Sequence, residues 1–289
     1  MHTLKTARPR PELRPFVRTF AQRDIDRSDA VVNESVPAIL EQILSFELGE
    51  RVDIFHADGR HQVSSVSALC GTQSRFAAHM SLAPGTHSFG IFFQPAGFWY
   101  LFGVPMFEVT NRAEEAEAVL GAAIRKLWNR LGELSTFEDR IQITEEFLLQ
   151  RISRVSNHNK VAAAADYVLQ RHGAMRMTEL AERANLGLRQ FERQFLRDVG
   201  VSPKTFARVA RFQTALDAKI SCPERTWVDI AHDYGYHDQM HMIHDFEKLG
   251  HNSPTQLIAA LGDNRPPGMM ADDEKSKECR IFTMRKSAA

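Results

Sequence analysis

Two stretches of this sequence repeat one pattern: MTELAERANL at 177–186 and WVDIAHDYGY at 227–236. Near the end of each stretch stand Asn185 and Gly235, the two residue types that most readily accept a positive φ. Self-similarity at a fixed interval indicates a duplicated structural unit. The duplication, rather than either copy alone, decides the expected fold of this part of the chain.

Each copy has the residues of a helix-turn-helix. A small residue, Ala181 or Ala231, allows the first helix to approach the second closely, and the turn follows four residues later. The second helix then packs through apolar residues four apart. Each copy ends at a Ser-Pro pair, which supplies an N-cap and the first position of a new helix. The residues that follow this pattern are Phe191, Phe195 and Ser202-Pro203 in the first copy, and Met242, Phe246 and Ser253-Pro254 in the second.

The segment between the copies predicts a stiff connecting helix from Pro203 to Lys219. At 1.5 Å per residue this helix is about 25 Å long. It would hold two reading helices apart by something close to the ~34 Å of one DNA turn. Altogether the sequence predicts seven helices, at 160–171, 178–184, 188–198, 203–219, 227–233, 239–249 and 254–261.

These residues resemble a known family. Residues 160–261 are similar to the C-terminal DNA-binding domain of the AraC/XylS transcription regulators, and the more specific match is the second copy, from Asp229-Ile230-Ala231 to Ser253-Pro254. Two positions depart from the family pattern: His251 stands where the first copy has Gly200, and His244 where arginine is common. The resemblance implies sequence-specific binding of double-stranded DNA and regulation of transcription.

The first reading helix carries a basic stripe, because Arg189, Arg193 and Arg197 step by four. Early positions of a reading helix lie deepest in the major groove. We therefore expect Arg189, Glu192 and Arg193 at base edges and Arg197 at a backbone phosphate, with Gln190 in the same interface. The alternative is that this stripe is an ordinary solvated helix face.

The second reading helix offers a different set of side chains. Glutamine can read adenine, and methionine or isoleucine can touch thymine methyl groups. The predicted contacts are Gln239, Met240, His241, Ile243 and His244. The four-residue spacing of His237 and His241 could also share a metal ion, but no cysteine or second carboxylate completes a ligand set, so we predict no metal site.

Composition indicates an ordinary globular chain. Lys plus Arg and Asp plus Glu both total 36, with 43% apolar and 25% charged residues. No apolar run approaches the roughly 18 residues that span a bilayer. Three cysteines far apart do not suggest a disulfide framework. We expect a reduced, cytoplasmic protein without a membrane partner.

The N-terminal half predicts a β-rich domain with trailing helices. An extended arm at 7–20 leads into a short helix or strand, and the pattern is typical of β structure from about 39 to 100, with a hairpin signal at Asp58-Gly59. Helical periodicity follows at 116–131, ending at Gly132, and again at 137–152. The expected class is α+β multidomain, with domains at 1–155 and 156–262 and a flexible tail at 263–289. The family resemblance implies a sensing or dimerising N-terminal domain, often a cupin-like barrel.

Aromatic residues gather between Phe89 and Phe107 and could line a ligand pocket, although most are expected to be barrel core. Cys70 and Cys222 have no base nearby in sequence, and no phosphate-binding glycine loop or nucleophile elbow is present. We therefore predict a regulator without catalytic residues or cofactor. The partners considered are duplex DNA, a small-molecule effector of unknown identity, a second subunit, and RNA polymerase if the outcome is activation. The alternative is a β-barrel enzyme with a helical accessory domain.

Overall fold

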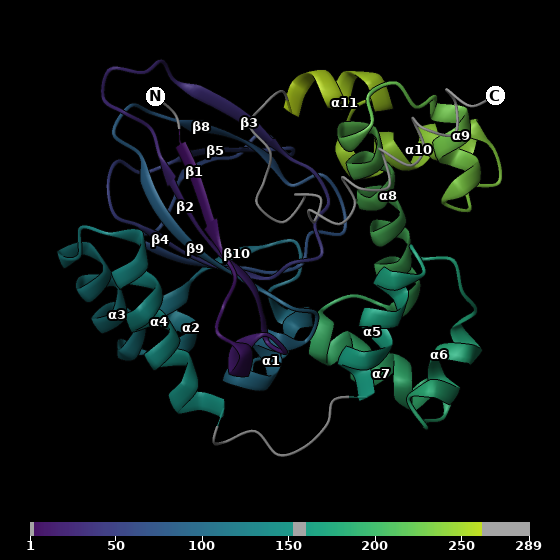
Figure 1. Ribbon diagram of the computed structural model, residues 1–289, viewed down its shortest axis with the longest axis horizontal. Coiled ribbons are helices and arrows are strands. Elements are labelled where there is room, and N and C mark those ends of the chain that lie inside the picture. Colours follow the sequence, from purple (N-terminus) through teal and green to yellow (C-terminus); the bar gives the residue numbers. More distant parts are fainter. Residues whose placement is uncertain (1–2, 153–159, 262–289) are drawn as a thin grey trace.

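The protein has a β-rich N-terminal part and an all-helical C-terminal part (Figure 1). The computed structural model describes residues 3–152 and 160–261. This is the α+β organisation expected from the sequence. The expected boundary at 155/156 and the tail at 263–289 lie outside the described residues. No helix in the described ranges is long and apolar enough to cross a membrane.

The N-terminal part contains two antiparallel sheets. In the described residues the larger sheet has the order β1-β2-β9-β4-β7-β10 and the smaller has the order β3-β8-β5-β6. The larger sheet contains β1 (Thr3–Ala7), β2 (Val17–Asp24), β9 (His87–Phe93), β4 (Ile43–Glu47), β7 (Ser67–Cys70) and β10 (Ala113–Glu115). The smaller contains β3 (Val32–Val36), β8 (Ala78–Leu82), β5 (Asp53–His56) and β6 (His61–Val63). The predicted hairpin at Asp58-Gly59 is confirmed, since β5 pairs with β6 across it.

The two faces of the larger sheet carry different side chains. Successive residues of a strand point to opposite faces, and residues opposite one another on neighbouring strands share a face. Its outer face is rich in phenylalanine and leucine and packs against helices α1 (Gly97–Phe102), α3 (Ala122–Glu133) and α4 (Phe137–Ile152). The inner face carries two cross-strand rows on β2, β9 and β4. We call them the small row (Ala21, Gly90 and Ser45) and the charged row (Arg23, Ser88 and Glu47).

Three expectations for the N-terminal half were wrong in detail. The helix expected at 116–131 is two helices, α2 (Ala116–Leu120) and α3, because Gly121 between them has a φ of +80°. Gly132 does not end the second of these, which continues through Glu133. The β structure begins well before residue 39, because β1 and β2 precede it; the arm expected at 7–20 leads into a strand, β2, which was one of the two predicted alternatives.

The C-terminal part consists of helices throughout the described residues 160–261. The seven predicted helices are present with bounds that differ by at most two residues: α5 (Lys160–Gln170), α6 (Met177–Arg183), α7 (Leu188–Val199), α8 (Pro203–Ser221), α9 (Trp227–Asp233), α10 (Gln239–Gly250) and α11 (Pro254–Leu261). The long helix α8 runs through the middle of this domain (Figure 1). Its apolar core also takes in Ala38, Ile39 and Leu40 of the N-terminal domain, so the two domains are packed together.

Candidate nucleic-acid interface

The first helix-turn-helix is formed by α6 and α7. The turn between them places Asn185 at a φ of +50°, as the sequence predicts for this position. Leu186 then donates its N–H to the carbonyl of Ala181 at 3.0 Å. Phe191 and Phe195 are fully buried and meet edge to face, with ring centroids 5.5 Å apart. Both rings share a core with Leu180 and Ala181 of α6, so α7 packs against α6 through this face and leaves its other face to solvent.

The second helix-turn-helix, formed by α9 and α10, repeats this geometry. Gly235 occupies the turn with a φ of +69°. Met242 and Phe246 are fully buried. The hydroxyl of Thr226 caps α9, and the Asp238 carboxylate caps α10 by accepting the N–H of His241 at 2.7 Å. That hydrogen bond is the main reason why the pKa of Asp238 is lowered.

A buried ion pair positions α10 against α8. Asp245 is 3% exposed and accepts a hydrogen bond from Arg208 Nε at 2.7 Å, while Arg211 lies 3.9 Å away on the same helix. The helix-turn-helix pattern in the sequence does not by itself predict this ion pair. A signal was present, because Asp245 follows Met242 by three positions and therefore lies on the apolar face of α10.

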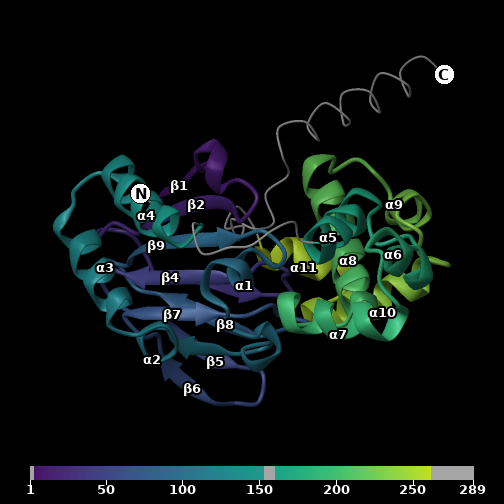
Figure 2. The same ribbon diagram turned by 90° about the horizontal axis from the view of Figure 1, so that it is seen from below.

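The two reading helices lie at different levels along α8. Figure 1 shows α7 toward one end of α8 and α10 toward the other, and Figure 2 shows both on the same side of the domain. The 19 residues of α8 give a helix about 28 Å long. Ser202 begins it as predicted, its hydroxyl accepting the N–H of Thr205 at 3.1 Å.

The predicted contacts of the first reading helix divide into two groups. Arg189, Gln190, Glu192 and Arg193 are exposed on α7. Arg197 is only partly exposed, because its guanidinium lies over the Trp99 ring at 4.6 Å and Nε donates to Asp198 at 2.7 Å. The structure therefore brings four of these side chains to one open surface and turns the fifth toward the N-terminal domain.

The second reading helix presents fewer free side chains and no arginine. Gln239, Met240 and His244 are exposed, and Met240 retains 57% of its accessible surface. His241 and Ile243 are partly buried, with the His241 ring 5.5 Å from that of Tyr236. No group of three or more potential metal ligands gathers in the described residues.

Both reading helices are held at their C-terminal ends by the N-terminal domain. The carbonyls of Val199 and Gly200, at the end of α7, accept hydrogen bonds from Thr72 at 2.9 Å and Thr110 at 2.7 Å. The carbonyl of Leu249, near the end of α10, accepts the N–H of Ala38 at 2.7 Å. The last carbonyls of a helix lack partners within it, so these contacts satisfy otherwise unused acceptors.

His251 and Gly200 occupy equivalent cap positions. Gly200 has a φ of +95° and His251 a φ of +60°, so both are left-handed. The His251 ring is stacked on Phe76 of the N-terminal domain, with centroids 5.0 Å apart. The departure from glycine in the second copy is therefore accompanied by a contact between domains.

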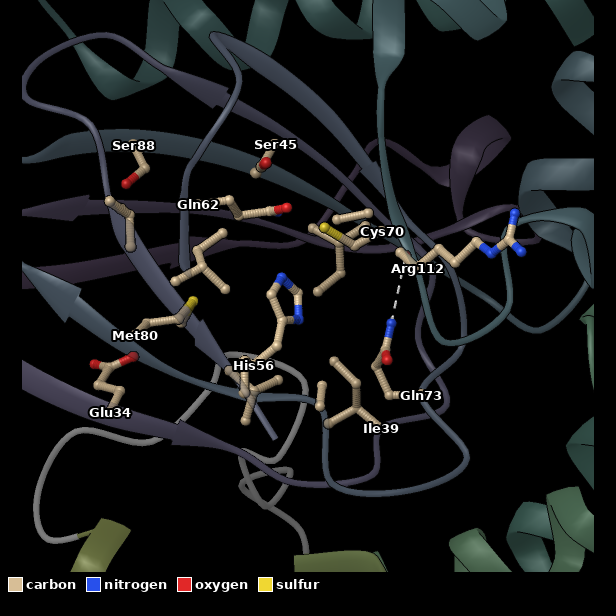
Figure 3. Close-up of a pocket in the computed structure, with 18 of the residues that line it drawn as sticks. Glu34, Ile39, Ser45, His56, Gln62, Cys70, Gln73, Met80, Ser88 and Arg112 are labelled. Carbon is tan, nitrogen blue, oxygen red and sulfur yellow. Dashed lines mark hydrogen bonds between the residues drawn. The ribbon is translucent and has the colours of Figure 1, made fainter. Parts of the chain in front are cut away.

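A cavity of about 520 Å³ lies between the two sheets (Figure 3). It is lined by both rows of the larger sheet and by side chains of the smaller one, including Glu34, His56 and Met80. Phe76 and Ile39 form part of its wall near the helical domain. Of the eight aromatic residues between 89 and 107, four are buried (Phe89, Phe92, Phe93 and Phe98), and Phe107 is exposed; Phe89 and Phe92 also line the cavity. Burial raises the pKa of Cys70, in the cavity wall, to about 12, which disfavours a reactive thiolate.

Comparisons with known proteins agree with this division into two parts. Residues 180–260 match a family model described as a helix-turn-helix domain, and residues 5–115 match a domain of unknown function, DUF6597. No curated protein sequence matches the chain.

Solved structures that align with this chain do so at low sequence identity. ToxT from Vibrio cholerae, crystallised in an apo variant form, aligns with 9% identity and a TM-score of 0.46 over 89% of this chain and 100% of its own. ToxT with a bound unsaturated fatty acid aligns with 10% identity and a TM-score of 0.45, over 83% and 94%. The AraC-like activator CuxR aligns with 10% identity and a TM-score of 0.29, over 73% and 86%.

Proposed function

We propose that this chain is a DNA-binding transcription regulator of the AraC/XylS type, which reads specific sequences by placing α7 and α10 in successive major grooves; the helix-turn-helix family model matched at residues 180–260 supports this. The observation that carries this proposal is that α7 and α10, which both have exposed side chains, lie on one side of a domain spanned by a helix of about 28 Å.

The proposed contacts are those of the sequence analysis. Arg189, Glu192 and Arg193 reach base edges from α7, accompanied by Gln190, and Gln239, Met240, His241, Ile243 and His244 contact DNA from α10. Arg197 reaches a phosphate once it leaves Trp99. Because α10 has no arginine, α7 should contribute more than α10 to discrimination between bases. A bidentate arginine–guanine contact contributes about 1–3 kcal/mol of such discrimination.

Selection of duplexes from a random-sequence library by the full chain tests the proposal. We expect an enriched motif of two half-sites about 10 base pairs apart, and an affinity that falls steeply with salt. Arg193→Ala should relax the choice of base at one position. Arg130→Ala, which removes an exposed arginine on α3, is the matched control and should leave the motif unchanged. Absence of any enriched motif would refute sequence-specific reading.

We further propose that the N-terminal domain is an effector domain and that the cavity binds the effector. The proposal is supported by the position of Phe76, which lines the cavity and also stacks on His251 at the end of α10. Ala38 makes the adjoining hydrogen bond to Leu249. A ligand that shifts this wall would change the orientation of the second reading helix relative to the first. A cytoplasmic location follows from this function.

A further inference from the structure

The cavity has an apolar middle and a charged end. The small row leaves space above the larger sheet, because alanine, glycine and serine stand where the outer face has phenylalanine and leucine. Ile39, Met80 and Phe92 add apolar wall. The charged row stands two residues along the same strands, toward one end of the cavity. A ligand that fills this space therefore needs an apolar body with one polar end.

The buried charges at that end do not balance. Arg23 Nη1 forms an ion pair of 2.9 Å with Glu34 of the smaller sheet, and both side chains are largely buried. Glu47 also lines the cavity and is only 8% exposed. Among the buried side chains of the described residues, one guanidinium thus lies with two carboxylates at this end of the cavity. Glu47 Oε2 has no hydrogen-bond partner among the described residues, so this end of the cavity has an unused acceptor.

Burial dominates the electrostatics of Glu47. It raises the pKa of this carboxyl to about 7, against the opposing effects of a hydrogen bond from Ser88 and of the charges on Arg23 and Arg51. Burial, and to a smaller extent the charge of Glu47, raises the pKa of the Cys70 thiol, which lines the same cavity. A desolvated carboxylate of this kind is stabilised most by a positive charge that enters the same enclosed space.

Other hydrogen-bonding groups in the cavity are neutral or already engaged. The Gln73 amide donates to the carbonyl of Gly71 at 2.9 Å. The His56 ring points into the cavity (Figure 3), and its Nε2 has no partner in the described structure. Arg23 Nε likewise has none, but Glu34 already matches the charge of that guanidinium. The described residues of the interior therefore offer no unmatched positive charge to an anion.

The arginines at the rim are exposed to water. Arg60 is bound to Asp58 at 2.8 Å, Arg75 is exposed, and the Arg112 side chain leads away from the cavity (Figure 3). Solvent and salt screen charges in such positions, whereas they screen buried charges much less. The buried excess of negative charge therefore outweighs the exposed arginines in selecting a ligand.

From this arrangement we infer that the cavity binds an apolar organic cation, whose ammonium group pairs with Glu47 while its hydrocarbon or aromatic body lies over the small row. This inference rests on the proposed effector role of the cavity and names the chemical class of its ligand.

The test compares three probes that share one ring system and differ in charge: tryptamine, tryptophol and indolepropionate. Isothermal titration calorimetry with the full chain at about pH 8, where both the amine and most of Glu47 are charged, should give the tightest binding for tryptamine. Glu47→Gln should weaken tryptamine about tenfold or more and change tryptophol little. Glu133→Gln makes the same change at an exposed carboxylate on α3, outside the cavity lining, and serves as the matched control, with tryptamine affinity unchanged.

Three results would overturn the inference: no binding of tryptamine, tighter binding of indolepropionate, or a Glu47→Gln variant that binds tryptamine as the wild type does. Thermal unfolding of the variant confirms that it is folded. Duplex binding, measured separately on the same samples, distinguishes the two proposals. If the chain selects a DNA sequence but fails the ligand tests, only the inference of a cationic ligand is refuted. If tryptamine binds as expected but does not change the affinity for DNA, the effector role of the cavity is refuted.

Discussion

Arg193 is exposed on α7, whereas Arg197, one turn later, lies at the contact between the domains. Periodicity places both on one stripe of the helix, and only the neighbouring domain distinguishes them. Trp99 lies under the Arg197 guanidinium, and Tyr100 donates its hydroxyl to the buried Asp198 at 3.4 Å. Arg197 therefore has two partners available, a phosphate or the N-terminal domain.

Arg197→Ala should have two separable effects. It leaves the Asp198 carboxylate, which is 1% exposed, without its ion-pair partner. We expect the free energy of unfolding to fall by about 1–2 kcal/mol, discounted for the partial exposure of Arg197. Affinity should fall equally for all duplexes, because a phosphate contact carries no sequence information. Urea denaturation and duplex titration measure the two effects, and loss of one base preference would contradict the assigned role.

Glu47 should make stability depend on pH. Its pKa rises from an ordinary 4.5 to about 7 on folding, so the folded state binds a proton that the unfolded state has already released between these values. Stability from this group is therefore highest below about pH 4.5 and is lost as the pH rises to about 7. Glu47→Gln should remove this loss. Between pH 4.5 and pH 8, the free energy of unfolding of the variant should therefore rise relative to that of the wild type by up to about 3 kcal/mol. If the free energy of unfolding depends on pH in the same way in both proteins, Glu47 is not the source of this pH dependence.

At the scale of the element, the C-terminal caps of the two reading helices, Gly200 and His251, have the same backbone conformation but pack against different parts of the N-terminal domain. Gly200 packs so closely on η2 (Met106–Glu108) and the residues after it that an added Cβ would lie 2.6 Å from Thr110 Oγ1 and 3.0 Å from the Met106 carbonyl. His251 has a side chain at the same cap and uses it against Phe76. The first cap thus requires glycine for space and for its φ, and the second tolerates histidine.

Gly200→Ala should destabilise the protein by about 1–3 kcal/mol, through left-handed strain and the close approach to Thr110. Chemical denaturation measures the loss. Gly132→Ala is the control, since Gly132 is helical and an added Cβ meets nothing within 4 Å. That control should be neutral or slightly stabilising. If the Gly200→Ala variant is as stable as the wild type, the end of α7 does not pack closely against Met106 and Thr110.

Replacement of His251 separates strain from stacking. His251→Gly relieves the left-handed strain but loses the ring contact with Phe76, so the free energy of unfolding should change by less than about 1 kcal/mol. His251→Ala keeps the strain and loses the ring, and should cost about 1–2 kcal/mol. In both variants we expect faster hydrogen exchange at the end of α10. Unchanged exchange there would mean that the ring does not anchor this helix.

At the scale of the whole molecule, the N-terminal domain contacts both reading helices. Because the N-terminal domain contacts the end of each, its shape sets their relative orientation. Hydroxyl-radical footprinting of the full chain on a selected duplex should therefore show two protected segments on one face, about 10 base pairs apart. The segment under α7 should be protected at higher salt than that under α10, which has no arginine. Protection of a single segment would indicate that only one head binds.

The sequence alone determined the elements of the C-terminal domain. Its helices are bounded by local signals, such as the Ser202-Pro203 cap and the positive-φ residues Asn185 and Gly235, and these act within a few residues of themselves. Duplication of the signals made the helix-turn-helix units recognisable. The break at Gly121 was missed because helical periodicity continues on both sides of it.

Tertiary structure alone decided how these elements meet the rest of the chain. The contacts of Arg197 with Trp99 and of His251 with Phe76 join residues about a hundred or more positions apart, and no local pattern encodes such partners. The cavity likewise depends on strand register, which brings Ala21, Gly90 and Ser45 into one row although they are scattered along the sequence. Burial of Glu47 follows from the same pairing, because exclusion of water is a property of the packed sheets and of no single segment.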